Sequence, residues 1–192
     1  MNLLKKFSRK LEFLMFRIFF ARKMLFCGAQ AFIQAPNRID GLEFVSLGYA
    51  SVIQRGSWLY CQSIDKNVPN LTIGARCVLG FNNHIAAVRE VIIEDDVLTA
   101  NNVYISDNFH DYREIDVPII EQPILYKGAV RIGRGTWLGE NTCVIGVTIG
   151  RNCVIGANTV VTRDVPDYSV VVGAPGRVIR QYDHQQKRWV DK

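Results

Sequence analysis

The stretch VRIGRGTWLGENTCVIGVTIGRNCVIGANTVV, residues 130–161, places an aliphatic side chain at almost every sixth position. Ile132, Leu138 and Val144 follow one another in steps of six, and after one shorter step Ile149 begins a second series of the same kind. A period of six matches neither the repeat of an α-helix nor the two-residue alternation of a single amphipathic strand. The pattern favours short strands separated by tight turns.

The same step recurs upstream, starting from residue 47. The repeated aliphatic positions, which we call anchors, are Leu47, Ile53, Leu59, Ile73, Leu79, Ile85, Ile93, Thr99, Ile105, Ile132, Leu138, Val144, Ile149, Ile155 and Val161. Three strands per coil of a triangular solenoid would turn every anchor inward and stack the coils on a continuous apolar column. Glycine often follows an anchor, and we expect it at corners because it tolerates backbone angles that other residues avoid.

The count of six breaks in four places. Short breaks separate Leu59 from Ile73, Ile85 from Ile93, and Val144 from Ile149, whereas the longest break runs from Ile105 to Ile132. It begins with ISDNFHDYREIDVP, residues 105–118, which contains a histidine at position 110. Loops extruded from a rigid scaffold are common sites of function, so we predict a functional loop over residues 106–129.

Composition and charge limit the function classes. The 192 residues suit one domain, and the hydrophobic content of 48% supports a sizeable core. The net charge of +5 is uneven, because residues 1–26 carry +6 and the remainder sums to −1. A body this close to neutral argues against a nucleic-acid surface. The scattered cysteines suggest reduced thiols in a cytosol rather than disulfides or zinc ligands; they are Cys27, Cys61, Cys77, Cys143 and Cys153.

The N-terminal stretch MNLLKKFSRKLEFLMFRIFFARKMLF predicts a basic amphipathic helix. Its apolar residues recur at helical steps, at Leu4, Phe7, Leu11, Leu14, Ile18 and Leu25. Arg17 interrupts the apolar run, which suits neither a membrane-spanning helix nor a signal peptide. Two interpretations stay open: a helix packed on its own protein or a sister subunit, and a helix lying in a membrane interface with its basic residues toward anionic headgroups.

With these repeats, the sequence resembles the hexapeptide-repeat acyltransferases over about residues 45–164. The resemblance implies an all-β fold, a left-handed parallel β-helix, to which the residue patterns above add an N-terminal amphipathic helix and one extruded loop. That hand is an exception to the usual right-handed crossover. It also implies a homotrimer with each active site between two solenoids. We expect residues 1–44 to form the helix and a linker, 45–181 the acetyltransferase domain, and 182–192 a polar C-terminal tail.

Three motifs are similar to the sugar O-acetyltransferase branch of that family, which includes maltose, galactoside and lipopolysaccharide acetyltransferases. They are DNFHDY (107–112), VRIGRGTWLG (130–139) and GAPGRVIR (173–180). The branch has a catalytic histidine at the start of a loop before such repeats, which implies that His110 is catalytic. A neutral imidazole can accept the proton of a sugar hydroxyl as it attacks a thioester, so we expect direct transfer without a Ser or Cys nucleophile.

The resemblance also suggests where the acceptor binds. An asparagine near the acceptor stands upstream of the histidine in this branch, which implies a catalytic contact for Asn82. We expect acceptor contacts in the same stretch and after the catalytic histidine, at Asn83, His84, Asp111, Tyr112 and Arg113. The sugar enzymes usually have two aspartates where this chain has Ala87 and Val88. An acceptor contact is therefore absent or replaced at this place.

Residues for acetyl-CoA, the donor substrate, carry over from the same resemblance. The repeats imply contacts to pantetheine from Trp137, Gly139 and Ala157, and contacts from Thr162 and Arg163. The motif after the repeats adds Arg177 and Arg180 near the nucleotide phosphates, and the planar fork of arginine suits phosphate oxygens.

We therefore expect an acetyl-CoA-dependent O-acetyltransferase of a sugar hydroxyl in bacterial surface polysaccharide biosynthesis (lipopolysaccharide, capsule or exopolysaccharide). The acceptor would be a sugar or lipid-linked glycan, and neither a metal nor a nucleic acid is expected. Two alternatives stay open: acetylation of a small acceptor such as a nucleotide sugar, an antibiotic or an amino acid, and a non-catalytic β-helix scaffold. The expected location is the cytoplasm, including a peripheral position at the inner face of the bacterial inner membrane through residues 1–26.

Overall fold

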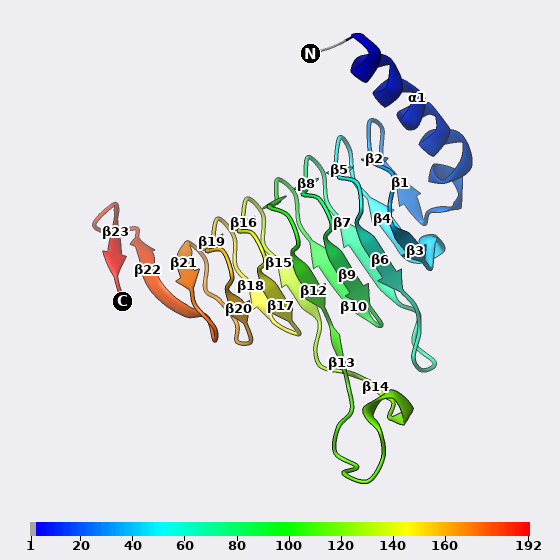
Figure 1. Ribbon diagram of the computed structural model, residues 1–192. Helices are drawn as coiled ribbons and strands as arrows, with labels where there is room; N and C mark the ends of the chain where they lie inside the picture. Colours follow the sequence, from blue (N-terminus) through cyan, green and yellow to red (C-terminus); the bar gives the residue numbers. More distant parts are fainter. Residues whose placement is uncertain (1–2) are drawn as a thin grey trace.

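The protein is a triangular solenoid of parallel strands with one helix at its N-terminal end (Figure 1). The computed structural model describes the backbone of residues 3–192 and the side chains of residues 10–192. The predicted fold class, a left-handed parallel β-helix with an N-terminal helix and an extruded loop, is confirmed. The side chains of Leu4, Phe7 and the basic residues before Lys10, which entered the helix prediction, lie outside the described residues.

Three parallel sheets form the sides of the prism, and successive strands along the chain move from sheet A to sheet B to sheet C. Sheet A contains β1 (Phe26–Cys27), β4 (Val45–Leu47), β7 (Asn70–Ile73), β10 (Glu90–Ile93), β15 (Val130–Ile132) and β18 (Thr148–Ile149). Sheet B contains β2 (Phe32–Ile33), β5 (Val52–Ile53), β8 (Val78–Leu79), β11 (Leu98–Thr99), β16 (Trp137–Leu138), β19 (Val154–Ile155) and β21 (Ser169–Val172). Sheet C contains β3 (Arg38–Asp40), β6 (Trp58–Cys61), β9 (His84–Ala87), β12 (Tyr104–Ser106), β17 (Cys143–Ile145) and β20 (Val160–Val161).

The anchors form the core, as predicted. Every anchor is buried, with at most 2% of its surface exposed. Strand register stacks them directly: Ile73 pairs with Ile93 and Ile93 with Ile132 in sheet A, while Ile85 pairs with Ile105 in sheet C. Burying each aliphatic side chain contributes about 1.5–3 kcal/mol before the entropy cost of ordering the chain. The column of anchors therefore fixes the register of the whole solenoid.

The glycines that follow the anchors need a different explanation from the one expected. Positive φ angles occur two residues further along, as at Asn141 (56°) and Asn152 (50°), and not at Gly139 or Gly150. A Cβ at Gly139 would come within 2.7 Å of the backbone nitrogen of Ala157 in the next coil. These glycines are required because neighbouring coils approach too closely for a side chain, while the left-handed turn falls on the asparagines.

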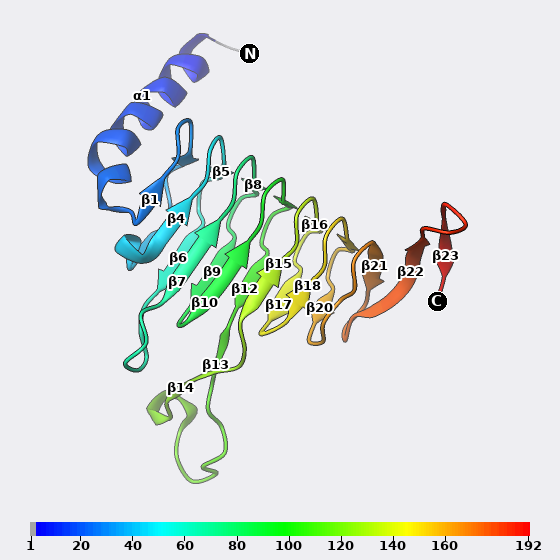
Figure 2. The same ribbon diagram turned by 180° about the vertical axis from the view of Figure 1, so that it is seen from behind.

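All four breaks in the repeat lie where sheet C leads into sheet A, which we call the C–A edge. The insertion after Leu59 connects β6 to β7, and the shorter breaks connect β9 to β10 and β17 to β18. The longest break forms an antiparallel hairpin of β13 (Asn108–His110) and β14 (Ile124–Tyr126), with the short helix η3 (Ile119–Glu121) in its loop. Figures 1 and 2 show this hairpin projecting from the solenoid.

Regular structure extends beyond the predicted repeat at both ends. The first coil, β1 to β3, lies within the expected linker, and its inward residues Cys27, Ile33 and Ile39 already follow the six-residue step. The short helix η2 (Leu42–Phe44) connects this coil to the next. At the other end, β22 (Arg177–Asp183) and β23 (Arg188–Asp191) form antiparallel strands, and the latter falls where a polar tail was expected.

The helix α1 (Leu3–Phe19) packs on the first coil through aromatic side chains. Phe13 and Phe16 contact Phe32 of β2 in edge-to-face geometry, with ring centroids 5.5 and 5.6 Å apart. The short helix η1 (Ala21–Lys23) follows and buries Ala21. The guanidinium of Arg17 also contacts the first coil, where it donates a hydrogen bond to the carbonyl oxygen of Gly28 over 3.0 Å. No helix in the described part of the chain has the length and the apolar run needed to cross a bilayer.

Candidate active site

The base of the extruded hairpin is held by a buried carboxylate. Asp107 is fully buried and accepts hydrogen bonds from the backbone N–H groups of Val88, Arg89 and Glu90 at 2.7 to 3.0 Å. Its own carbonyl oxygen accepts from the backbone N–H of Lys127 over 2.8 Å. One residue therefore ties both ends of the hairpin to the preceding coil.

His110 ends β13 and is held through its backbone. It pairs with Ile124 across the hairpin, and its side chain is exposed to solvent. No hydrogen bond to the imidazole is present within the described residues. An exposed imidazole on a strand fixed at its base has the freedom to exchange a proton with a bound hydroxyl.

The residues after His110 form a closed turn. The carboxylate of Asp111 accepts two hydrogen bonds from the Arg113 guanidinium, at 2.8 and 2.6 Å, and one from the backbone N–H of Tyr112 over 2.8 Å. The hydrogen bonds from Arg113 hold the pKa of Asp111 well below its usual range. This carboxylate is therefore occupied by its own loop. Asp111 and Arg113, two of the three predicted acceptor residues here, bind each other. The third, Tyr112, has an exposed ring that takes no part in this ion pair.

Asn82, Asn83 and His84 lie together but differ in orientation. Asn82 has a positive φ of 55° at the turn from sheet B to sheet C, which we call the B–C edge, and corresponds to Asn102 and Asn141 in later coils. Asn83 is 1% exposed, and its amide bonds inside the solenoid to Thr99 and to the backbone of Val103. The structure thus explains both asparagines as parts of the scaffold.

His84 is the member of this group that faces outward. Its ring stacks on Trp58 with centroids 4.2 Å apart and planes 3° apart, and Tyr104 lies 5.2 Å away on the other side. Burial lowers the pKa of His84, which favours the neutral ring. Trp58, Asn82, Asn83 and His84 line one surface hollow, which the aromatic rings make suitable for the apolar face of a small ring.

The predicted pantetheine residues gather on neighbouring coils near the same edge. Trp137 is on the outer face of sheet B, half exposed, between Leu98 and Val154 of the adjoining strands. Gly139 and Ala157 follow on consecutive coils at the B–C edge, and Gly139 has no room for a side chain because of Ala157. Trp137 and Ala157 are exposed at this edge, whereas Gly139 is buried between the coils.

The remaining predicted donor residues lie elsewhere. Thr162 and Arg163 are exposed after β20, at the C–A edge. Arg177 is exposed at the start of β22, while the Arg180 guanidinium donates to the Asp191 carboxylate over 2.7 Å. Arg180 would have to leave this surface ion pair to bind a phosphate, and such pairs contribute little stability.

One chain thus distributes the predicted residues over two edges of the prism. His110, Thr162 and Arg163 are at the C–A edge, whereas His84 and Ala157 are at the B–C edge. Trp137 faces outward from sheet B. No hydrogen bond or ring contact in the described part of the chain connects His110 with the residues at the other edge. Among the described side chains, no group of three His, Cys, Asp or Glu could hold a metal ion.

Cys61, Cys77 and Cys153 are buried inside the solenoid. Burial raises the pKa of the Cys77 and Cys153 thiols, and raises the pKa of Cys61 to about 12. A thiol with a raised pKa holds little thiolate at neutral pH and is a poor nucleophile. The five cysteines are all free.

Two residues near the site were missed by the sequence analysis. Asp107 could have been suspected because it directly follows the last strand before the loop, at a point where an acidic side chain can accept backbone N–H groups. Trp58 is one residue before the anchor Leu59 and was not singled out by the six-residue pattern. The signal available for it was the aromatic at the same repeat position in consecutive coils, namely Trp58, His84 and Tyr104.

Known proteins share the six-residue repeat of this chain. The family model of the hexapeptide repeat of succinyl-transferase matches residues 70–107 and 129–163. A probable acetyltransferase of Mycobacterium tuberculosis (strain ATCC 25618 / H37Rv) is 36% identical over 88% of this chain and 52% of its own length. WbbJ of Escherichia coli (strain K12), an O-acetyl transferase named for lipopolysaccharide biosynthesis, is 38% identical over 55% of this chain and 58% of its length.

A third relative aligns over most of both proteins. The galactoside O-acetyltransferase of Escherichia coli (strain K12) is 30% identical over 82% of this chain and 76% of its own length. The chain spans little more than half the length of the other two relatives.

Proposed function

This chain belongs to the hexapeptide-repeat acetyltransferase family, and from that premise we propose that it is an acetyl-CoA-dependent O-acetyltransferase of a sugar hydroxyl. One observation carries the proposal. The solenoid is interrupted most strongly at the hairpin that bears His110, and that hairpin is pinned at its base by the buried carboxylate of Asp107. A scaffold protein would have no need to hold one exposed histidine so firmly.

His110 acts as the general base in this mechanism. One imidazole nitrogen accepts the hydroxyl proton while the sugar oxygen attacks the thioester carbonyl carbon. The tetrahedral intermediate then collapses, the C–S bond breaks, and the CoA thiolate recovers the proton from the imidazolium. General base catalysis of this kind contributes about 10²–10⁴-fold to the rate. Both substrates bind together, so no acyl-enzyme forms.

The donor runs along the outer surface of the later coils. Trp137 would pack against pantetheine, and the backbone at the exposed Ala157, which lies over the buried Gly139, would hydrogen bond with its amides. Thr162 and Arg163 extend the donor site, and Arg177 and Arg180 would bind the nucleotide phosphates. The exposure of Trp137, Ala157 and Arg177 supports this assignment.

The acceptor is proposed to be a sugar unit of a bacterial surface polysaccharide, carried as a lipid-linked glycan. The similarity to galactoside O-acetyltransferase and to WbbJ supports a sugar hydroxyl. The hollow around Trp58 and His84 supports an acceptor ring stacked near Asn82. Ala87 and Val88 are both fully buried, so they provide no polar contact where sugar enzymes of the family usually have aspartates.

A homotrimer with shared active sites accounts for the separation of the two edges. The C–A edge of one copy would supply His110 to the B–C edge of its neighbour, which carries His84 and Ala157. The tip of the hairpin supports such a contact, because Ile115 and Ile120 are about nine-tenths exposed in a single chain. Apolar side chains exposed to this degree are typical of surfaces covered by a partner. The enzyme would work in the cytoplasm.

Replacement of His110 tests the mechanism. With labelled acetyl-CoA and a panel of free and lipid-linked glycans, His110→Ala should lower the rate of acetyl transfer by about 10²–10⁴-fold. His184→Ala, at an exposed histidine of the C-terminal strands, is the matched control and should keep the wild-type rate. Circular dichroism and thermal unfolding should be unchanged in both variants.

Two results would contradict the proposal at different levels. Full transfer by His110→Ala would exclude His110 as the base while leaving the transferase activity intact. A wild-type protein without measurable affinity for CoA by calorimetry would exclude the transferase activity and favour a non-catalytic scaffold. Transfer to a nucleotide sugar, an antibiotic or an amino acid, with none to the glycans, would favour acetylation of a small acceptor.

A further inference from the structure

The helix α1 turns its widest apolar face away from the protein. Phe13 and Phe16 are the residues that contact the first coil. Leu11, Leu14, Met15 and Ile18, which we call the ridge, lie on the other side and are 51%, 53%, 46% and 48% exposed. Leu11 is three and four residues before Leu14 and Met15, and Ile18 is four and three residues after them, so the four side chains share one face of the helix. Within the described chain, about half of the surface of each of these side chains stays exposed.

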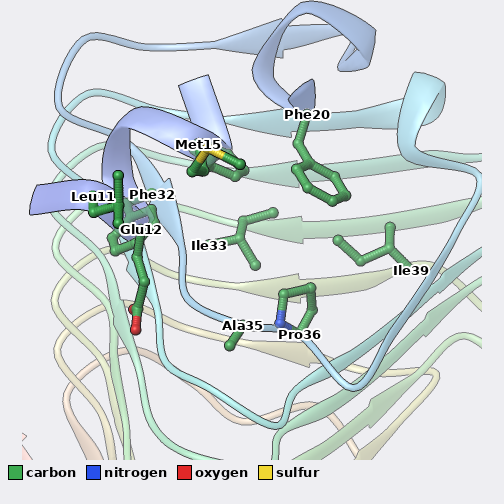
Figure 3. A pocket seen from close by; sticks show the side chains of 10 residues that line it. Leu11, Glu12, Met15, Phe20, Phe32, Ile33, Ala35, Pro36 and Ile39 are labelled. Atoms are coloured by element: carbon green, nitrogen blue, oxygen red, sulfur yellow. The ribbon is translucent and has the colours of Figure 1, made fainter. Parts of the chain in front are cut away.

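The ridge continues into an apolar pocket between α1 and the first coil. Leu11 and Met15 line this pocket from the helix, and Ile33, Pro36 and Ile39 line it from the coil (Figure 3). Phe19 at the end of the helix is also exposed, as are Phe20, Leu25 and Phe26 beyond it. This end of the solenoid therefore exposes eight large apolar side chains within residues 11–26, which is more than singly scattered apolar residues would give.

Charge around the ridge is positive and largely unopposed. Residues 1–26 contain seven Lys or Arg and one acid, Glu12. Glu12 is already paired with Arg55 of the solenoid over 3.4 Å. Lys10 is exposed one turn before Leu14, and Arg22 and Lys23 are exposed at the end of the helix. An apolar face flanked by basic side chains is typical of helices that lie in the interface of anionic bilayers.

We propose that the ridge and its basic flank dock the protein on the surface of an anionic phospholipid bilayer. The charge decides between a bilayer and a second copy of the chain. Another copy would bring an equally basic segment toward this one, and the rest of its surface sums to −1. Anionic headgroups provide the opposite charge along the whole flank. This inference stands independently of the proposed transferase activity.

The placement of α1 suits such docking. Figures 1 and 2 show the helix at the N-terminal end of the solenoid, away from the hairpin β13–β14. A bilayer under α1 would leave His110 and the later coils accessible. The ridge would insert into the outer part of the hydrocarbon while Lys10, Arg22 and Lys23 stay among the headgroups.

Vesicle binding by the full-length protein tests the proposal, without acetyl-CoA. The probes are phosphatidylcholine vesicles with and without phosphatidylglycerol. We expect co-sedimentation only with the anionic vesicles, weakened by salt because surface charges are screened. The double variant Leu14→Ser/Ile18→Ser should bind about tenfold or more weakly, and Lys10→Gln/Lys23→Gln about tenfold more weakly. Val68→Ser, at a 75% exposed apolar residue of another loop, is the control and should bind as wild type.

A fluorescence probe and the oligomeric state distinguish the other outcomes. In Leu14→Trp, the tryptophan emission should shift to the blue on addition of anionic vesicles, because the indole enters an apolar environment. Equal binding to both vesicle types, or none to either, would overturn the proposal. If wild type fails to bind while Leu14→Ser/Ile18→Ser loses subunits in light scattering, the ridge is a contact between copies and the proposal is wrong.

Discussion

The B–C edge repeats one turn in coil after coil, whereas the C–A edge changes with every coil. At the B–C edge a residue with positive φ recurs in equivalent positions, as at Gly56, Asn82, Asn102, Asn141 and Asn158. At the C–A edge the connection is an insertion, a short bend or a complete hairpin. Regularity at one edge keeps the anchors stacked, and this stability allows the other edge to vary.

The two edges also solve the problem of backbone polarity differently. At the regular edge each turn donates a backbone N–H to the coil before, such as Asn102 to Phe81 and Asn141 to Asn101. At the C–A edge the long hairpin has no neighbouring turn to pair with. At the base of the hairpin, the carboxylate of Asp107 accepts hydrogen bonds from backbone N–H groups of the previous coil. A function that depends on this edge thus depends on one carboxylate.

The largest effect is expected from Asp107→Asn. An asparagine offers one acceptor oxygen where three N–H groups now donate to a carboxylate, and a buried donor left unsatisfied costs about 1–3 kcal/mol. We expect the free energy of unfolding to fall by that amount in urea titrations. Limited proteolysis should cut within residues 106–129 faster than in the wild type, since the base of the hairpin is loosened.

Asp183→Asn provides the matched control. Asp183 accepts backbone N–H groups of Gln185 and Gln186 in the same manner, but in an exposed turn where water can replace them. Its replacement should change the free energy of unfolding by no more than about 0.5 kcal/mol. Equal effects of the two substitutions would show that the C–A edge does not depend on Asp107 in the way described.

A moderate effect is expected at a regular turn. Asn152 has a φ of 50°, and the equivalent position in the previous coil is Gly135, with a φ of 72°. Alanine is strained in this conformation by about 1 kcal/mol, while glycine is not. Thermal unfolding should therefore rank Asn152→Ala below Asn152→Gly. The reverse order would mean that the asparagine side chain, and not its backbone angle, stabilises the turn.

The smallest effect concerns pH. Hydrogen bonds from Arg113 hold the pKa of Asp111 below its ordinary value of 3.8. A carboxyl with a lower pKa in the folded state stabilises the fold fully above its unfolded pKa. This contribution is lost as the pH falls from the unfolded pKa toward the lower folded-state pKa. The stability difference between wild type and Asp111→Asn should therefore stay constant near neutrality and shrink as the pH is lowered below 3.8. A difference independent of pH would contradict this assignment.

The predicted site residues show where sequence reasoning ends. Asn83 carried the expectation of an acceptor contact because it adjoins Asn82, but its side chain bonds inside the solenoid to Thr99. Asp111 follows a histidine in a loop, yet its carboxylate is taken by Arg113. Asn82 and Asn83 lie in the turn before β9, where the positive φ of Asn82 precedes a residue whose side chain points inward. The carboxylate of Asp111 binds the cation two residues away. Residue type alone predicts neither the direction of the Asn83 side chain nor the partner of the Asp111 carboxylate.

The sequence by itself determined the solenoid, because a six-residue period can be buried only by short strands stacked in coils, and every anchor is inside. It also located the loop of His110, since a long break in a strict period must leave the stack. Only the tertiary structure decided that all four breaks share one edge, that Asp107 pins the hairpin, and that the ridge of α1 faces away from its own chain. These features depend on which side chains meet in space. Packing between residues that are apart in the sequence, such as Phe16 and Phe32, determines them.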